Sequence, residues 1–128
     1  MFYKNLYKYD KHNNLISDIH FSKKNNTLEQ TITKEYKYDS LNRLIQSKHI
    51  FSKTNFTTTN YFYYNNGLLK SESGLSEYSK KAVWSEYIYD KNENLKKVQE
   101  YYISDKEKKK KGRYYVIKYE FYKYSDCF

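Results

Sequence analysis

Residues 36–44 read YKYDSLNRL, a pattern that recurs along the chain and decides its fold. Three further segments align with it without gaps, and each carries a leucine eight residues after its leading tyrosine. These segments are YKYDKHNNL from Tyr7, YFYYNNGLL from Tyr61 and YIYDKNENL from Tyr87. Successive copies start 29, 25 and 26 residues apart, so the sequence predicts a tandem array of one structural unit. A fifth, degenerate copy, YEFYKY, begins at Tyr119.

Each unit predicts a β-hairpin. The two tyrosines of Tyr-x-Tyr lie on one face of a strand, because side chains alternate between the faces of a sheet. The aspartate that follows opens a turn by accepting hydrogen bonds from nearby backbone N–H groups. Three residues later stand Asn13, Asn42, Gly67 and Glu93. Asparagine and glycine tolerate the positive φ of a bulged hairpin turn, whereas glutamate does not, so we expect Asn94 to take that conformation in the fourth copy.

The segments between these turns predict the strands of an antiparallel sheet. Threonine, tyrosine, isoleucine, valine and phenylalanine favour strands, and here they alternate with polar residues. Strict alternation places Leu28 on the same face as Tyr36, and it places Leu15 on the same face as Ile19. The remaining segment, SGLSEYSKKA at residues 73–82, is the one place where we expect room for a short helix.

The sequence therefore predicts an all-β fold: an antiparallel meander of about nine or ten strands built from tandem hairpins. We expect a single domain over residues 1–128. A meander buries one face by curling on itself or by packing its halves together, so we expect a curled sheet or an open barrel. Tyrosine, with its apolar ring and polar tip, suits a thin and partly hydrated core.

The charge of the chain favours an acidic partner. Lysine and arginine number 24 against 15 acidic residues, which gives a net charge of +9, and 20% of the 128 residues are aromatic. No apolar run approaches the ~18 residues of a membrane helix, so we expect no membrane contact. The first residues lack an apolar stretch of signal-peptide length, and we expect a cytoplasmic protein. The single cysteine, Cys127, excludes an internal disulfide framework and a thiolate zinc site.

The repeated motif resembles the YD-repeat, or Rhs-repeat, family, whose units read roughly Tyr-x-Tyr-Asp-x-x-Gly-Arg/Asn-Leu. The segments YDSLNRL at residues 38–44 and YDKNENL at residues 89–95 carry this resemblance most closely. The segment YYNNGLLKSE at residues 63–72 is also similar to the MORN-variant repeats of antitoxin-like bacterial proteins. Small repeat proteins of this kind often accompany polymorphic toxins as immunity proteins, so the resemblance implies a bacterial protein that binds and blocks a cognate toxin.

We therefore expect a non-enzymatic protein-binding module with two contact regions. The first contains the tryptophan and the motif tyrosines: Trp84, Tyr87, Tyr89, Tyr61 and Tyr63. Tyrosine and tryptophan are common anchors of protein interfaces and lose little side-chain entropy on binding. The second lies in the basic segment of residues 106–113, which we expect to be a hairpin loop followed by a strand that begins at Tyr114. Its residues are Lys108, Lys109, Lys110, Lys111 and Arg113. Lysines there would steer an acidic partner, a cognate toxin, towards the surface.

Two other functions remain open on the sequence. Lysines interleaved with tyrosines are typical of single-strand nucleic-acid binding, in which bases stack on the rings. The chain has 22 lysines but only 2 arginines, however, and arginine is the side chain that recognises phosphate and guanine best. A structural surface repeat protein is the third alternative, and it would self-associate without binding a specific ligand.

No pattern in the sequence predicts catalysis or a cofactor. His20 and His49 occupy the same repeat position, five residues after Leu15 and Leu44, and would form a metal or acid–base pair if they met. Two ligands are too few for a metal site, so we expect no metal and no cofactor. The repeated aspartates belong to the turns, and no nucleophile elbow, phosphate-binding loop or zinc-protease motif is present.

Overall fold

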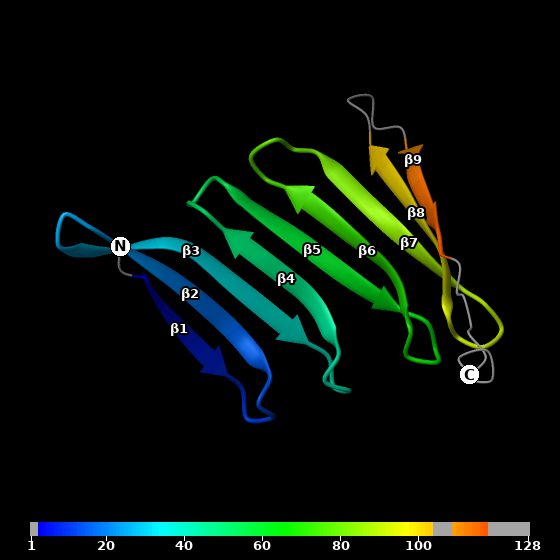
Figure 1. Cartoon of the computed structure of the whole chain (residues 1–128), viewed down its shortest axis with the longest axis horizontal. Helices are drawn as coiled ribbons and strands as arrows, with labels where there is room; N and C mark the ends of the chain where they lie inside the picture. Colours follow the sequence, from blue (N-terminus) through cyan, green and yellow to red (C-terminus); the bar gives the residue numbers. More distant parts are fainter. Residues whose placement is uncertain (1–2, 104–108, 118–128) are drawn as a thin grey trace, which may run out of the picture.

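Nine antiparallel strands make up the described part of the chain (Figure 1). The computed structural model describes residues 3–103 and 109–117, and no helix occurs within them. The strands are β1 (Tyr3–Tyr9), β2 (Leu15–Lys24), β3 (Thr27–Tyr38), β4 (Leu44–Ile50), β5 (Phe56–Tyr63), β6 (Leu69–Ser76), β7 (Ala82–Tyr89), β8 (Leu95–Ile103) and β9 (Lys109–Val116). Each strand pairs with its neighbours in sequence, from β1 to β9. The predicted all-β meander is confirmed.

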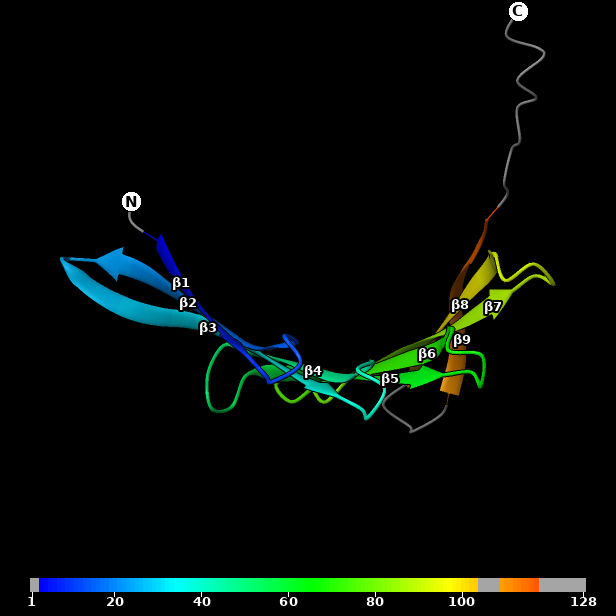
Figure 2. The ribbon, with the colours of Figure 1, turned by 90° about the horizontal axis from the view of Figure 1, so that it is seen from below.

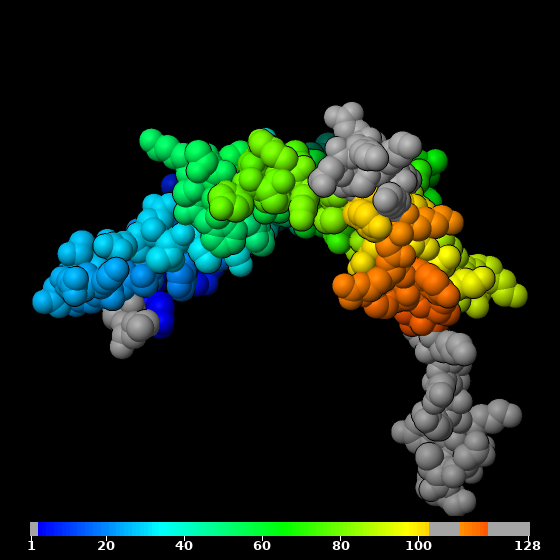
Figure 3. All heavy atoms as spheres, turned by 90° about the horizontal axis from the view of Figure 1, so that it is seen from above, coloured from blue at the N-terminus to red at the C-terminus, as the bar shows by residue number. Residues whose placement is uncertain are grey.

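The sheet is a single open layer. Figure 2 shows that it is bowed, with its two ends bent towards the same side, and Figure 3 shows the same arch with its side chains. Strands β1 and β9 form its edges, so the sheet is curled but not closed. In the described residues no hydrophobic side chain is buried, and the buried side chains are Ser47 and Gln99, with exposures of 5% and 6%. The expected thin core is therefore absent from this part of the chain.

The four motif turns lie at one end of the sheet and share one hydrogen-bond pattern. In the second copy, Asp39 N–H donates to the Arg43 carbonyl over 2.9 Å, and Asn42 N–H donates to the Asp39 carbonyl over 3.0 Å. The Asp39 carboxylate also accepts hydrogen bonds from the backbone N–H groups of Leu41 and Arg43. Equivalent contacts occur at Asp10 and Asp90. The predicted strand reversals are therefore confirmed.

The fourth turn corrects one expectation from the sequence. Glu93, not Asn94, has the positive φ, at 65°. Its backbone N–H donates to the Asp90 carbonyl, and Asp90 N–H donates to the Asn94 carbonyl, as in the other copies. The register of the turn therefore fixes which residue is left-handed, even though a glutamate there is strained by about 1–2 kcal/mol.

Each motif hairpin contains a bulge, which corrects the expected alternation of side chains. The residue after each repeat leucine has no partner in the opposite strand: Ile16, Ile45, Lys70 and Lys96. Leu15 consequently pairs with Tyr9 and lies on the opposite face from Ile19. A further register shift between β2 and β3 separates Leu28 from Tyr36 in the same way. Strict alternation is wrong at these positions because each bulge reverses the order of the faces.

The second tyrosine of each motif ties its repeat to the one before. Three such hydrogen bonds, which we call tyrosine clasps, join a tyrosine hydroxyl to a leucine carbonyl: Tyr38 to Leu15 over 2.8 Å, Tyr63 to Leu44 over 2.6 Å and Tyr89 to Leu69 over 2.9 Å. Each leucine opens the returning strand of the preceding repeat, directly before the bulged residue. The clasps therefore satisfy backbone acceptors where the bulge interrupts the ladder.

Two other expectations from the sequence are wrong. Residues 73–82 form the hairpin between β6 and β7, because Ser76 N–H donates to the Lys81 carbonyl and Lys80 N–H donates to the Ser76 carbonyl. The last described strand begins at Lys109, not at Tyr114, so part of the basic segment is a strand paired with β8. The fifth motif copy from Tyr119 lies outside the described residues.

Candidate binding surfaces

The motif tyrosines gather on one face of the sheet, which we call the tyrosine face. Register places there Tyr7, Tyr9, Tyr36, Tyr38, Tyr61, Tyr63, Tyr87 and Tyr89. One row of paired residues crosses this face from β3 to β8, and its members are Tyr36, Ser47, Thr59, Gly74, Val83 and Tyr102. The tyrosine face therefore combines aromatic rings with short hydroxyl side chains.

Several tyrosine hydroxyls on this face are used within the sheet. Tyr61 shares a hydrogen bond of 3.1 Å with the Ser47 hydroxyl. Partial burial, the nearby Glu72 carboxylate and a hydrogen bond to it raise the pKa of Tyr87 to about 12. Burial also raises the pKa of Tyr36 and of Tyr38. The raised pKa values of Tyr36, Tyr38 and Tyr87 mean that these three phenols are protonated at neutral pH.

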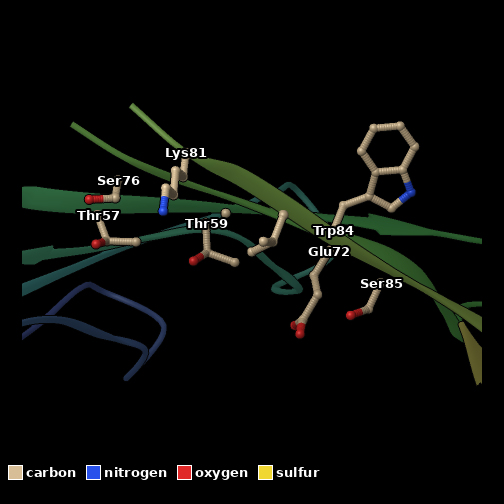
Figure 4. A pocket seen from close by; sticks show the side chains of 9 residues that line it. Thr57, Thr59, Glu72, Ser76, Lys81, Trp84 and Ser85 are labelled. Atoms are coloured by element: carbon tan, nitrogen blue, oxygen red, sulfur yellow. The ribbon is translucent and has the colours of Figure 1, made fainter. Parts of the chain in front are cut away.

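A shallow hollow of about 340 Å³ lies over β5, β6 and β7 on the tyrosine face. Figure 4 shows Thr57, Thr59, Glu72 and Ser85 on one side of the sheet, with Trp84 pointing to the other. Gly74 forms part of the lining, and a Cβ atom there would come no closer than 3.7 Å to the Thr59 hydroxyl oxygen. The hollow therefore exists because small side chains form much of its lining.

The opposite face, which we call the lysine face, carries a second row of paired residues. This row runs from β3 to β9 through Lys37, Gln46, Asn60, Ser73, Trp84, Tyr101 and Lys111. Trp84 packs against Tyr101 with ring centroids 5.4 Å apart. The Tyr101 hydroxyl donates to the Glu86 carboxylate over 3.1 Å, and desolvation and this bond raise the pKa of Tyr101.

Lysine side chains on this face lie over aromatic rings. The Lys48 ammonium is 4.3 Å from the centroid of Phe56, and the Lys97 ammonium is 5.1 Å from the centroid of Tyr114. Both distances fall within the range of cation–π attraction. The charged groups are thereby held close to apolar surface.

The two faces differ in charge. Among paired strand residues with described side chains, the lysine face has seven lysines: Lys4, Lys8, Lys23, Lys37, Lys48, Lys97 and Lys111. Its acidic residues are Glu35 and Glu86. The tyrosine face has Lys24 and Lys34 against Asp18, Glu29, Glu72 and Glu100. The positive charge of the strands is therefore concentrated on the lysine face.

The structure separates the residues of the first expected contact region. Trp84 lies on the lysine face, whereas Tyr61, Tyr63, Tyr87 and Tyr89 lie on the tyrosine face. Tyr87 and Tyr89 are three and five positions after Trp84 along β7, so their side chains leave the strand on the side opposite to that of Trp84. These residues therefore do not form one continuous patch, and their part in binding stays a prediction.

The second expected region is only partly described. Lys108 lies outside the described residues, and Lys109 and Lys110 are described as backbone of β9 only. Lys111 pairs with Tyr101 on the lysine face. Arg113 lies in the bulge opposite Glu100, where Gln99 donates to the Arg113 carbonyl over 3.3 Å.

His20 and His49 share the tyrosine face but belong to different surroundings. His20 stacks on Tyr3 with ring centroids 5.6 Å apart, and one of its ring nitrogens is hydrogen-bonded to the Asn5 side chain. His49 lies two strands away, between Lys34 and Thr57. Strand spacing and register separate the two histidines by roughly 12 Å, so they do not form a pair.

The described residues contain no group of three or more His, Cys, Asp or Glu side chains that would hold a metal ion. Nor do they include a helix of the length and apolarity needed to cross a membrane.

Sequence reasoning did not single out Phe62, Lys48, Lys97 and Tyr101 as members of one surface with Trp84. Phe62 is 53% exposed. It pairs with Ser71, and Ser71 pairs with Glu86 of the lysine face, so Phe62 lies on the lysine face as well. The two-residue period from Trp84 would have identified Glu86 and Ile88, but the partners on other strands depend on the register. The bulges set that register.

The chain matches no protein-family model and no curated protein. It is similar to the crystal structure of a protein of unknown function from Bacteroides fragilis, with 11% identity and a TM-score of 0.49 over 91% of this chain and 92% of that one. A DUF3836 family protein from Parabacteroides distasonis has 17% identity and a TM-score of 0.40 over 82% of this chain and 94% of that one. At these values neither similarity supports a functional argument.

Proposed function

We propose that this chain is a non-enzymatic protein-binding module in which the open sheet supplies one layer and the partner supplies the second. One observation carries the proposal: no hydrophobic side chain is buried in the described residues. A sheet normally buries an apolar face against a second layer, because the burial of that face stabilises the fold. A partner protein provides such a layer.

The size of the sheet supports this proposal. The nine strands lie about 4.8 Å apart and are mostly eight or more residues long, so each face covers roughly 1,100 Å². Each partner in a stable complex of ordinary size buries about 800 Å². One face of the sheet therefore has the area of a whole protein–protein interface.

The exposed side chains also support binding rather than catalysis. Large apolar side chains are exposed in every described strand except β2, and Tyr102 and Tyr114 are 43% and 63% exposed. Rigid aromatic residues of this kind anchor protein interfaces. The carboxylates of Asp10, Asp39 and Asp90 already accept backbone hydrogen bonds in the turns.

In its narrower form, the proposal is that the partner is a bacterial toxin, which the module occupies and blocks. The resemblance of the turn motif to the hairpin repeats of immunity proteins supports this form. The net charge of +9 supports it as well, since such a charge accelerates association with an acidic partner.

Co-expression of the chain with the product of the gene adjacent to its own tests the proposal. We expect the two proteins to co-elute in size-exclusion chromatography and the chain to rescue cells from the toxicity of that product. A basic protein of similar size and charge, without this sheet, is the control and should do neither. If the chain neither forms the complex nor rescues growth, the proposal is wrong.

A further inference from the structure

We infer that the lysine face is the docking surface and that its partner presents an acidic protein surface with apolar side chains at its centre. This inference rests on the proposed function and adds to it the face that binds and the chemistry of the partner. It follows from the distribution of charge, the exposed apolar side chains and the occupied aromatic rings.

The charge distribution selects the lysine face. Among the paired strand residues with described side chains, the lysine face has seven lysines and two glutamates. The tyrosine face has more acidic residues than lysines. Complementary charge steers a partner to one side of a thin sheet, because the field of each face acts mainly on the solvent next to it. An acidic protein therefore meets the lysine face first.

Exposed apolar side chains lie at the middle of the same face. Phe62 is 53% exposed, Leu75 is 39% exposed and Ile88 is 41% exposed, and all three lie on the lysine face with Trp84. Interfaces have this composition, with apolar anchors at the centre and charges around them. Lys37 and Lys111, at the two ends of the row of paired residues that contains Trp84, supply the charged rim.

The same contacts argue against a single-stranded nucleic acid. Bases stack on free aromatic faces, but Lys48 lies over Phe56 and Lys97 lies over Tyr114. Trp84 packs against Tyr101. Aliphatic side chains such as Leu75 and Ile88 offer a base no stacking surface. The arrangement therefore suits the mixed apolar and acidic surface of a protein.

A second copy of the chain is also a poor occupant of this face. Two lysine faces brought together would place like charges opposite each other, which opposes association. Stacking of a lysine face on the tyrosine face of another copy would satisfy the charges. That contact joins different surfaces, however, and would repeat without closing into a defined complex.

Two pairs of variants, matched in their chemistry but on opposite faces, test the inference in the full chain. Lys48→Glu with Lys97→Glu changes the lysine face, and Lys24→Glu with Lys34→Glu makes the same change of net charge on the tyrosine face. Phe62→Ser and Val83→Ser remove apolar side chains that are 53% and 56% exposed on the lysine face and tyrosine face, respectively. Thermal unfolding by circular dichroism should show that all four variants are folded.

The probe is the product of the adjacent gene, immobilised for kinetic measurements at several salt concentrations. We expect the lysine-face charge reversal to slow association about tenfold at low salt, with the difference shrinking as salt rises. We expect Phe62→Ser to weaken binding by about tenfold through faster dissociation. The tyrosine-face variants should bind like the wild type.

Each other outcome overturns the inference. If the wild type binds but the tyrosine-face variants are the weakened ones, the docking face is wrong while the proposed function stands. If the wild type does not bind the adjacent gene product, the proposed function and this inference both fall. Retention of a single-stranded oligothymidylate probe with the same sensitivity to the lysine-face variants would assign that face to nucleic acid. Concentration-dependent assembly of the chain alone, abolished by the same variants, would assign it to a second copy.

Discussion

The tyrosine clasps predict a specific and additive loss of stability. In Tyr38→Phe, Tyr63→Phe and Tyr89→Phe the ring stays and the hydroxyl that donates to a leucine carbonyl, over 2.6 to 2.9 Å, is removed. A partly buried hydrogen bond contributes about 1 kcal/mol to the free energy of unfolding. Neighbouring clasps lie two strands apart, about 10 Å, so their effects should add. The triple variant should therefore lose about 3 kcal/mol.

Urea unfolding followed by circular dichroism measures this loss. The midpoint should fall in proportion to the number of clasps removed, with an unchanged dependence of the free energy on urea. Tyr9→Phe is the matched control, because Tyr9 holds the same motif position in the edge strand β1 and is 59% exposed. That control should change stability by less than about 0.5 kcal/mol. A triple variant as stable as the wild type, or an equal loss in the control, would refute the role given to the clasps.

The turns and phenols give further predictions. Glu93→Asn should raise the stability measured by thermal unfolding by about 1 kcal/mol, because asparagine tolerates the positive φ of 65° better than glutamate does. Asn13→Glu should lower the stability by a similar amount. Equal stabilities of the variants and the wild type would contradict this. The pKa of Tyr87 is raised to about 12 by burial and a neighbouring glutamate, so the stability that its neutral form contributes is present below pH 10 and is lost as pH rises through 12. In an absorbance titration, Tyr87→Phe should remove a phenol that ionises near pH 12. Hydrogen bonds from backbone N–H groups hold the pKa values of Asp10 and Asp39 below 3.8, so the stability they contribute is present above about pH 4 and is lost as pH falls through the lowered values. Replacing both with asparagine should flatten the acid limb of stability against pH.

The hairpins could be predicted from the sequence because their information is local. An aspartate that accepts hydrogen bonds from the backbone N–H groups two and four residues later specifies its turn within a segment of five residues. The same pattern recurs in several copies, which strengthens the prediction. The third copy has Tyr64 in place of the aspartate, and there Asn66 accepts the Leu68 N–H group instead. Glu93 was missed because the backbone register of the turn outweighs the preference of one residue.

The arrangement of the faces could not be predicted by alternation alone. Each bulge reverses the faces, and no side chain at Ile16 or Lys70 distinguishes a bulged residue from a paired one. The repeat itself held a usable signal, since the bulge always follows the motif leucine. The assignment of Trp84 and Tyr87 to one patch has another cause: it followed residue type, whereas alternation along β7 already places the two side chains on opposite sides of the sheet. The sequence also could not predict that the sheet is open, because a composition poor in aliphatic residues is compatible with a thin core and with no core.

Lysine acetylation read by mass spectrometry, on the free chain and on its complex with the adjacent gene product, tests the account most directly. It compares lysines on the two faces of one sheet under the same conditions. The account predicts that Lys37, Lys48, Lys97 and Lys111 become protected in the complex while Lys24 and Lys34 react as in the free chain. Protection of Lys24 and Lys34 with no change on the lysine face would contradict it.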